Sequence, residues 1–355
     1  MKRFLFFATC ASLTLASCVN DEKLEELSES KSLISFSSPV VGANSRVIAG
    51  EMSNPFNTDE TFQVFGLMHE KTGYAGTGWD NADKLLIKDE TVVYNPTLNA
   101  WITKDKTYFW PKDKNMTFGA YSPTQVKTAV ASNSGTITYN ETGLNITGFE
   151  VDTDPENQYD LMYSEVAKNK TTSPSSATGG YNGVDINFHH ALSSINFYVK
   201  LDPSVTSGSI KNLKINNVKY QGNFSQNVVW NSETLSTTTL GTASWTRTDA
   251  KHSYTVYTDE VEAQTATNTK VGPNLILLPQ PFADNTEASV TLEYKMANNP
   301  WVSETIYLKD LTPGGWIMSK RYNYTIIIGG SGVTAIYFAP NVTDWSNEDD
   351  EILLP

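Results

Sequence analysis

The chain of 355 residues contains only two cysteines, Cys10 and Cys18. Small secreted domains that depend on disulfides carry several pairs of cysteines, and thiolate metal centres need clusters of them. Cys10 lies inside an apolar run, so Cys18 has no obvious disulfide partner. The sequence therefore excludes a disulfide framework and a thiolate metal cluster.

Basic residues are also few, since 26 Lys and Arg face 39 Asp and Glu and give a net charge of −13. An acidic chain without a basic stripe lacks the electrostatic footprint of a nucleic-acid-binding protein. We therefore expect no nucleic-acid partner. The chain has only four arginines, which are Arg3, Arg46, Arg247 and Arg321.

Long apolar runs are missing as well. The run Phe4–Leu15 has about a dozen residues, well short of the ~20 that a membrane-spanning helix needs. Lys2 and Arg3 precede it, and the small residues of Leu15-Ala16-Ser17 follow it. This order predicts a cleaved signal peptide over residues 1–17.

The signal ends in "LASC", which resembles the bacterial lipobox. In a lipobox the cysteine is acylated, for example with palmitate, and becomes the mature N-terminus. Each buried acyl methylene contributes about 0.8 kcal/mol, so acyl chains on Cys18 would hold the protein on a membrane. Residues 18–30 then form an acidic tether that resembles the surface-export signal of Bacteroidetes lipoproteins. The alternative is an ordinary signal peptide with an incidental cysteine.

Motifs for catalysis and cofactor binding are absent. The sequence contains no HExxH, P-loop or nucleophile elbow. Asp152, Asp154 and Glu156 have the alternate spacing of calcium ligands, but the loop lacks the central glycine and the closing glutamate. An acidic turn is therefore favoured over calcium, and we expect no cofactor, no metal and no enzymatic activity. A secreted hydrolase built on paired carboxylates remains an open alternative.

Alternating apolar residues in short segments predict an all-β protein. In residues 195–201, Ile195, Phe197, Val199 and Leu201 would face a core while Asn196 would face outward. The same alternation occurs in 289–296 and 322–328. Turn residues separate these segments at short intervals, as in β-sandwiches. Further strands are expected at 61–68, 255–261 and 275–282.

A stretch rich in Ser, Thr, Pro and Gly, residues 169–183, has no apolar periodicity. Such composition is typical of a surface loop or linker. We therefore expect one β-sandwich domain at 31–182 and a second at 183–355. Eight tryptophans offer a second possible function, because exposed indoles can stack on sugars, although tryptophans in sandwiches usually seal cores.

Several segments together resemble the fimbrillin-like family, the type V pilins and related lipoproteins of Bacteroidetes. Their order and spacing extend over nearly the whole mature chain, and the lipobox agrees with the resemblance. The segments are "YFWP" (108–111), "FGAYSP" (118–123), "DLMYS" (160–164), "INFHHALSSINFYVK" (186–200), "LLPQPF" (277–282), "WIMSKRYNYTIII" (316–328) and "NVTDW" (341–345).

The resemblance implies two tandem transthyretin-like, Greek-key β-sandwich domains. It also implies a cell-surface fimbrial subunit that travels as a lipoprotein to the outer membrane. In the family, a protease cuts after an arginine in the loop following the first strand. A donor strand from the next subunit then fills the hydrophobic groove, and other pilin subunits are the expected partners.

These features transfer to particular residues of this sequence. "SLISFSS" (32–38) matches the first strand, with Ile34 and Phe36 facing inward, and the cleavage would fall between Arg46 and Val47. The alternative is that Arg46 is simply a solvated cation of that loop. The residues after Trp345 are short for a donor strand, so Ile336 and Phe338 would plug a neighbour's groove. The alternative function is a surface glycan-binding lipoprotein or a pilus-tip adhesin for host or bacterial ligands.

Overall fold

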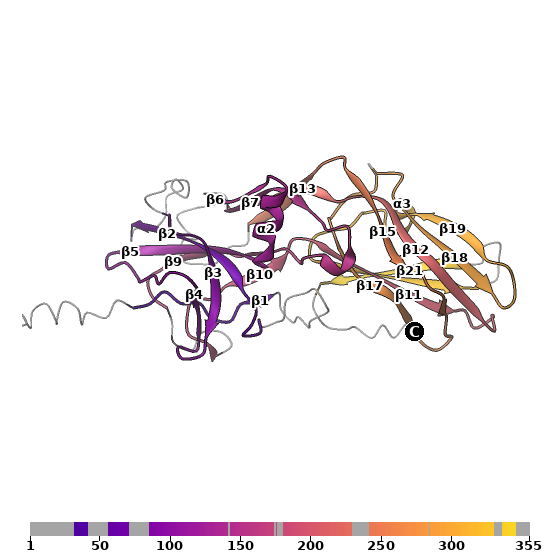
Figure 1. Cartoon of the computed structure of the whole chain (residues 1–355), viewed down its shortest axis with the longest axis horizontal. Helices are drawn as coiled ribbons and strands as arrows, with labels where there is room; N and C mark the ends of the chain where they lie inside the picture. Colours follow the sequence, from indigo (N-terminus) through magenta and orange to yellow (C-terminus); the bar gives the residue numbers. More distant parts are fainter. Residues whose placement is uncertain are drawn as a thin grey trace, which may run out of the picture. The chain divides into compact units, whose positions relative to one another are not determined.

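The computed structural model describes residues 32–41, 56–70, 85–140, 143–173, 175, 180–228, 241–283, 285–329 and 336–345. Nearly all regular structure in these ranges is β-strand, which confirms the predicted all-β class (Figure 1). The short helices there are α2 (Gln125–Ser132), α3 (Leu308–Leu311) and the 3₁₀ turn η1 (Pro155–Asn157). Within the described residues, no helix is long and apolar enough to cross a membrane.

The first sheet has eight strands in the order β1-β10-β8-β5-β2-β3-β4, with β9 pairing to β5. Both faces of its central strand β2 are buried, because Phe62 and Val64 enter one core while Phe65 and Leu67 enter another. Successive side chains of a strand point to opposite faces, so the even-numbered pair and the odd-numbered pair enter different cores. The strands are β1 (Val40–Val41), β2 (Phe62–Glu70), β3 (Leu85–Asn95), β4 (Ala100–Thr103), β5 (Lys114–Ser122), β8 (Met162–Ser164), β9 (Ala167–Lys170) and β10 (Asn187–His190).

A second, four-stranded sheet joins strands from distant parts of the sequence in the order β14-β13-β7-β6. Its centre is the antiparallel pair of β7 and β13, in which Ile146 lies opposite Phe224. The strands are β6 (Thr136–Asn140), β7 (Gly143–Glu150), β13 (Gln221–Asn227) and β14 (Thr242–Arg247).

Two further sheets pack against each other around a shared core. One has the order β17-β11-β20-β21 and the other β15-β12-β18-β19, with β16 pairing to β12. Phe197 and Tyr324 of the first sheet and Ile210 and Val290 of the second belong to one buried cluster. The strands are β11 (Ser193–Leu201), β12 (Gly208–Lys219), β15 (Lys251–Tyr257), β16 (Val261–Glu262), β17 (Thr269–Leu277), β18 (Ser289–Met296), β19 (Val302–Tyr307), β20 (Lys320–Ile328) and β21 (Ile336–Asp344).

The strands expected from alternation at 195–201, 289–296 and 322–328 are confirmed as parts of β11, β18 and β20. The outward placement of Asn196 is wrong, because this side chain is buried and donates to Asn323 Oδ1 over 3.0 Å. The expected strand at 255–261 is also wrong in extent. There β15 ends at Tyr257 and β16 begins at Val261.

Strand pairing crosses the position of the predicted domain boundary. β10 and β13 follow residue 183, yet they pair with β8 and β7, which precede it. The division into 31–182 and 183–355 stays a prediction.

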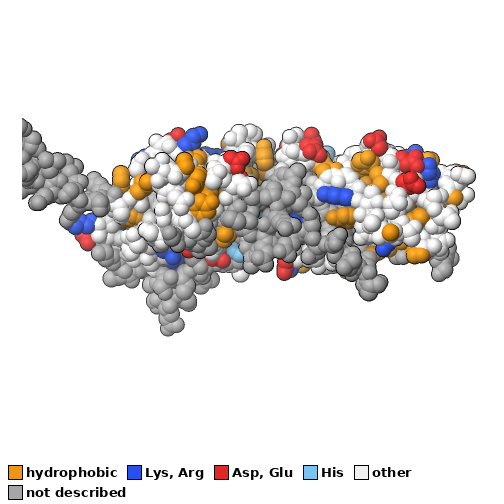
Figure 2. All heavy atoms as spheres, turned by 90° about the horizontal axis from the view of Figure 1, so that it is seen from below, with side chains coloured by type: hydrophobic (Ala, Val, Ile, Leu, Met, Phe, Trp, Pro, Cys, Tyr) orange, Lys and Arg blue, Asp and Glu red, His pale blue; other side chains and the backbone are white. Residues whose placement is uncertain are grey.

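The surface of the described residues carries few large apolar side chains. On the face shown in Figure 2, acidic and basic side chains are scattered among a mostly uncharged surface. The large hydrophobic residues that remain exposed are Leu98, Phe109, Tyr159, Val302, Tyr307, Ile317 and Val342.

Candidate functional site: the first-strand groove

The segment Leu33–Val41, called the first segment below, is hydrogen-bonded to neighbours along both edges. On one edge the Ile34 N–H donates to the Tyr108 carbonyl over 2.9 Å, and the Phe36 N–H donates to the Trp101 carbonyl over 2.8 Å. The Trp101 N–H returns a bond to the Phe36 carbonyl over 3.0 Å. The first segment therefore runs antiparallel to the chain at Trp101.

The opposite edge pairs with residues just before β10. The Val184 N–H donates to the Ser35 carbonyl over 2.9 Å, and the Ser37 N–H donates to the Val184 carbonyl over 3.0 Å. This pairing is parallel and continues between β1 and β10. Residues 34–37 have backbone partners on both edges and therefore fill a slot, whereas β1 (Val40–Val41) stands first in the sheet order, beside β10. We call this slot the first-strand groove.

The apolar side chains of the first segment enter the core of the first sheet. Ile34 and Phe36 are both buried, which confirms their predicted inward orientation. The ring of Phe36 meets the rings of Phe62 and Phe118 edge to face, with centroids 5.9 and 5.3 Å apart. Such aromatic pairs add about 0.5–1.5 kcal/mol beyond the area they bury.

Ser35 and Ser37, on either side of Phe36, are buried too. The Ser37 hydroxyl donates to Asp185 Oδ1 over 2.8 Å. The Ser173 hydroxyl oxygen accepts from the backbone N–H of Ser35 over 3.0 Å and from Trp110 Nε1 over 2.9 Å. The groove therefore buries large apolar side chains on one face of the segment and small serine side chains on the other.

Gly183 closes the groove over the backbone of Phe36. Its φ of +141° lies in a region that residues with side chains rarely adopt, and a Cβ there would stand 2.2 Å from the Phe36 carbonyl carbon. Glycine is therefore required for the chain to pass this close to the first segment.

Tyr108, on the other edge, donates its hydroxyl to Glu90 Oε1 over 2.9 Å. Burial, assisted by the Glu90 carboxylate, raises the pKa of Tyr108 above its ordinary value of 10.0. The phenol therefore stays protonated and keeps donating at physiological pH. This bond anchors the residue whose carbonyl pairs with the first segment.

The first segment ends next to the point where the described chain resumes. The Phe56 N–H donates to the Pro39 carbonyl over 3.0 Å, and the Phe56 ring stacks on Phe188 with centroids 5.4 Å apart. Residues 42–55 connect these two ends of the chain. Arg46, Val47 and Cys18 lie outside the described residues, so the roles predicted for them stay predictions.

The proposed donor residues Ile336 and Phe338 both lie in β21. This strand is last in its sheet order and pairs antiparallel with β20 from Ile336 opposite Ile328 to Asp344 opposite Lys320. Phe338 is half-buried against the larger core. In this structure β21 completes its own sheet, and its role as a donor stays a prediction.

The tryptophans do not form an exposed sugar platform among the described residues. Trp301 is partly exposed, and Lys211 and Lys295 lie over its ring. Trp79 and Trp230 lie outside the described residues. The tryptophans that are buried are Trp101, Trp110, Trp245, Trp316 and Trp345.

The acidic stretch at 152–156 forms a turn. Asp152 Oδ1 accepts from the Asp154 N–H over 2.8 Å, and Asp154 Oδ1 accepts from the Glu156 N–H over 3.1 Å. These carboxylates cap the backbone of η1 and of the residues before it.

Sequence reasoning missed the groove residues Ser173, Gly183 and Asp185. Two of them lie in the stretch interpreted as a linker, and nothing in the composition indicates that its ends contact the first segment. The glycine pair Gly179-Gly180 and the nearby Gly183 mark only a turn-rich stretch.

Several solved structures are similar to this chain at low sequence identity. A proposed cell adhesion protein of Bacteroides ovatus is 14% identical, with a TM-score of 0.48, over 90% of this chain and 99% of that chain. A second proposed cell adhesion protein, from Bacteroides uniformis, is 15% identical with a TM-score of 0.45, over 90% of this chain and 99% of that chain. The tip fimbrial protein Mfa3 of Porphyromonas gingivalis, with C-terminal truncation, is 12% identical with a TM-score of 0.33, over 86% of this chain and 99% of that chain.

No curated protein matches the sequence. A family profile described as fimbrillin-like matches residues 45–345, which is most of the chain. The predicted resemblance is confirmed by this match. The chain therefore belongs to the fimbrillin-like family, the structural and adhesive subunits of bacterial cell-surface fimbriae.

Proposed function

We propose that this fimbrial subunit assembles with other pilin subunits by exchanging the strand in its first-strand groove. The observation that carries the proposal is the seating of the first segment, whose residues 34–37 are paired on both edges and buried on both faces. Toward its C-terminus it is joined to the remaining chain through residues 42–55. A single cut there leaves the first segment held by non-covalent contacts alone.

An empty groove is costly. Without the first segment, the buried backbone groups of Trp101 and Val184 lose their partners, and each such group costs about 1–3 kcal/mol. The contacts of Ile34 and Phe36 are lost too, at about 1.5–3 kcal/mol for each buried side chain. Binding of a strand from another subunit is therefore strongly favoured, because it restores both the backbone hydrogen bonds and the buried apolar contacts.

Cleavage between Arg46 and Val47 is the proposed trigger. Arg247 lies in β14, and Arg321 is buried in β20, so folded structure protects both. Arg46 lies in the connection between Val41 and Phe56, where a cut frees the first segment. Solvated loops are the usual sites of proteolytic nicking.

Ile336 and Phe338 of a neighbouring subunit are the proposed replacements for Ile34 and Phe36. Both pairs place a β-branched residue two positions before a phenylalanine, so in a strand the two side chains point to the same face. Acylation of Cys18 is the proposed anchor that holds the precursor on the outer membrane before assembly.

Strand exchange can be tested with purified protein spanning residues 19–355. An arginine-specific protease is expected to cut once, after Arg46, and to leave the first segment bound. A fluorescent peptide of residues 32–41 should then enter slowly as the native segment leaves, and fluorescence anisotropy should rise.

The matched control peptide carries Ile34→Ser and Phe36→Ser, and the matched protein is Arg46→Ala. Anisotropy should not rise when the control peptide is added to cut wild-type protein, nor when the native peptide is added to protease-treated Arg46→Ala protein. Equal binding of both peptides, or equal binding to cut and uncut protein, contradicts strand exchange in this groove.

A further inference from the structure

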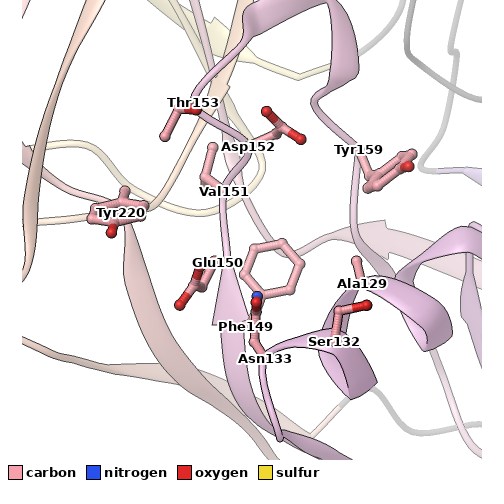
Figure 3. A pocket seen from close by; sticks show the side chains of 10 residues that line it. All are labelled: Ala129, Ser132, Asn133, Phe149, Glu150, Val151, Asp152, Thr153, Tyr159 and Tyr220. Carbon is pink, nitrogen blue, oxygen red and sulfur yellow. The ribbon is translucent and has the colours of Figure 1, made fainter.

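A pocket of about 270 Å³ opens between α2 and the chain that follows β7 (Figure 3). Residues of α2, β7 and the acidic turn surround it together with Tyr220, which lies between β12 and β13, and it shares no lining residue with the first-strand groove. Its chemistry combines aromatic walls with carboxylates. It is lined by 10 residues, among them Phe149, Glu150, Asp152, Tyr159 and Tyr220.

Two tyrosines flank the pocket from distant parts of the sequence. Figure 3 shows Tyr159 and Tyr220 on opposite sides, with the ring of Phe149 between them. Tyr159 is 37% exposed and Tyr220 is half-buried. Exposed tyrosine rings provide flat apolar surfaces next to a hydroxyl group, the combination that packs against the C–H face of a pyranose ring.

The carboxylates of the pocket are held in place by the fold. Glu150 Oε1 accepts from Gln221 Nε2 over 2.5 Å, and the same nitrogen donates to Tyr220 Oη over 3.1 Å. Asp152 is fixed through its bond from the Asp154 N–H. One amide therefore orients both a carboxylate and an aromatic wall, and each carboxylate keeps an oxygen that can accept from a ligand hydroxyl.

The charge of the pocket selects among ligands. The described residues that line it include two carboxylates and no basic side chain. Sugar acids would be repelled, whereas neutral sugars offer the hydroxyl donors that carboxylates accept. Ser132, Asn133 and Thr153 add hydroxyl and amide groups, which suit a polyol better than a simple cation.

We propose that this pocket binds a neutral hexose unit of a surface glycan, with Tyr159 and Tyr220 against the ring and Glu150 and Asp152 accepting from its hydroxyls. The observation behind the proposal is that Glu150, held in place by Gln221, lines the same pocket as Tyr159 and Tyr220. The proposal does not depend on strand exchange, because the two sites share no residue.

Saturation-transfer NMR on the purified chain tests the proposal, with the methyl glycosides of galactose, glucose, mannose and N-acetylglucosamine as probes. At least one should receive saturation on its ring protons. Tyr159→Ala should weaken that binding about tenfold, the equivalent of one aromatic contact. Glu150→Gln should weaken it as well, while Tyr159→Phe should retain it.

Tyr307→Ala is the matched control, because Tyr307 is a tyrosine of β19 that is 45% exposed and does not line the pocket. It should leave binding unchanged. The proposal is overturned if none of the four glycosides binds, or if binding survives in Tyr159→Ala and Glu150→Gln. Binding of lysine methyl ester at this pocket in place of any glycoside also overturns it, because a cation site is then indicated.

Discussion

The indole of Trp345 lies flat on the imidazole of His190, with ring centroids 3.9 Å apart and planes inclined by 3°. Both side chains are buried, and His190 Nδ1 lies 2.8 Å from Asp160 Oδ2. The backbone N–H of Trp345 donates to the Ser319 carbonyl over 2.9 Å. These contacts fix the end of β21, the proposed donor strand, to the place where β10 leads into β11.

Trp345→Ala is expected to loosen β21. Removing a buried tryptophan costs about 3–5 kcal/mol, because the cavity it leaves collapses only in part. Urea unfolding should show this loss, and hydrogen exchange at the amides of β21 should accelerate more than exchange in β2.

Trp301→Ala is the control for this variant, because Trp301 is partly exposed and lies outside the buried clusters. It should lower stability by much less than Trp345→Ala. Unchanged exchange in the β21 amides of Trp345→Ala contradicts the role assigned to the stack.

Gly183→Ala should displace the first segment. The new methyl group meets the Phe36 backbone, and the positive φ adds strain, so the cost should exceed about 1 kcal/mol. Hydrogen exchange at the amides of Ile34 and Phe36 should rise by more than the global loss of stability explains.

Gly314→Ala provides the comparison, because a Cβ at Gly314 meets nothing within 4 Å. This variant should keep the native exchange rates in the first segment. If the two variants behave alike, the close approach of Gly183 to Phe36 does not hold the segment in place.

Acid should destabilise the fold through His69. This side chain is buried with Nε2 2.9 Å from Thr117 Oγ1, and burial lowers its pKa below the usual 6.5. The unfolded chain therefore binds the proton more readily. The stability contributed by His69 is complete above pH 6.5 and is lost as the pH falls through the lower, folded pKa.

His69→Gln removes the titration and keeps a side-chain amide near Thr117. Urea midpoints measured between pH 7.5 and pH 5 should fall less for this variant than for the wild type. An identical fall in both proteins rules out His69 as a contributor.

Cys18→Ser should abolish lipid attachment. Cells fed an alkyne analogue of palmitate should label the wild-type protein and not the variant. Labelling that persists in Cys18→Ser contradicts acylation at this position, whereas loss of labelling with continued surface display points to an anchor elsewhere.

Alternation predicted which residues of a strand face the core, on the rule that one face is buried and the other meets water. Ile195, Phe197 and Val199 are buried as expected, and so are Val290 and Leu292 of β18. The rule fails at Asn196, because the second face of the β11–β20 pair is also covered and a buried amide pair replaces the expected solvent contact. An alternating sequence pattern does not indicate whether the second face of a strand is also buried.

Some residues of the candidate sites could be predicted from the sequence and others could not. Ile34 and Phe36 could be predicted because alternation and the family resemblance indicate the same strand. Ser173, Gly183 and Asp185 could not, because their contacts with the first segment are made across more than a hundred residues of chain. Tyr159 and Tyr220 likewise come from separate elements, and only the fold places them around one pocket.

The central claim is that the first segment is exchanged for a donor strand after cleavage at Arg46. The most direct test is the N-terminal sequence of the protein on intact cells, together with its size on a gel run without boiling. Strand exchange after cleavage predicts chains that begin at Val47 within a ladder of high-mass species, and uncleaved monomers in Arg46→Ala. Wild-type chains that begin at acylated Cys18 and remain monomeric would contradict it.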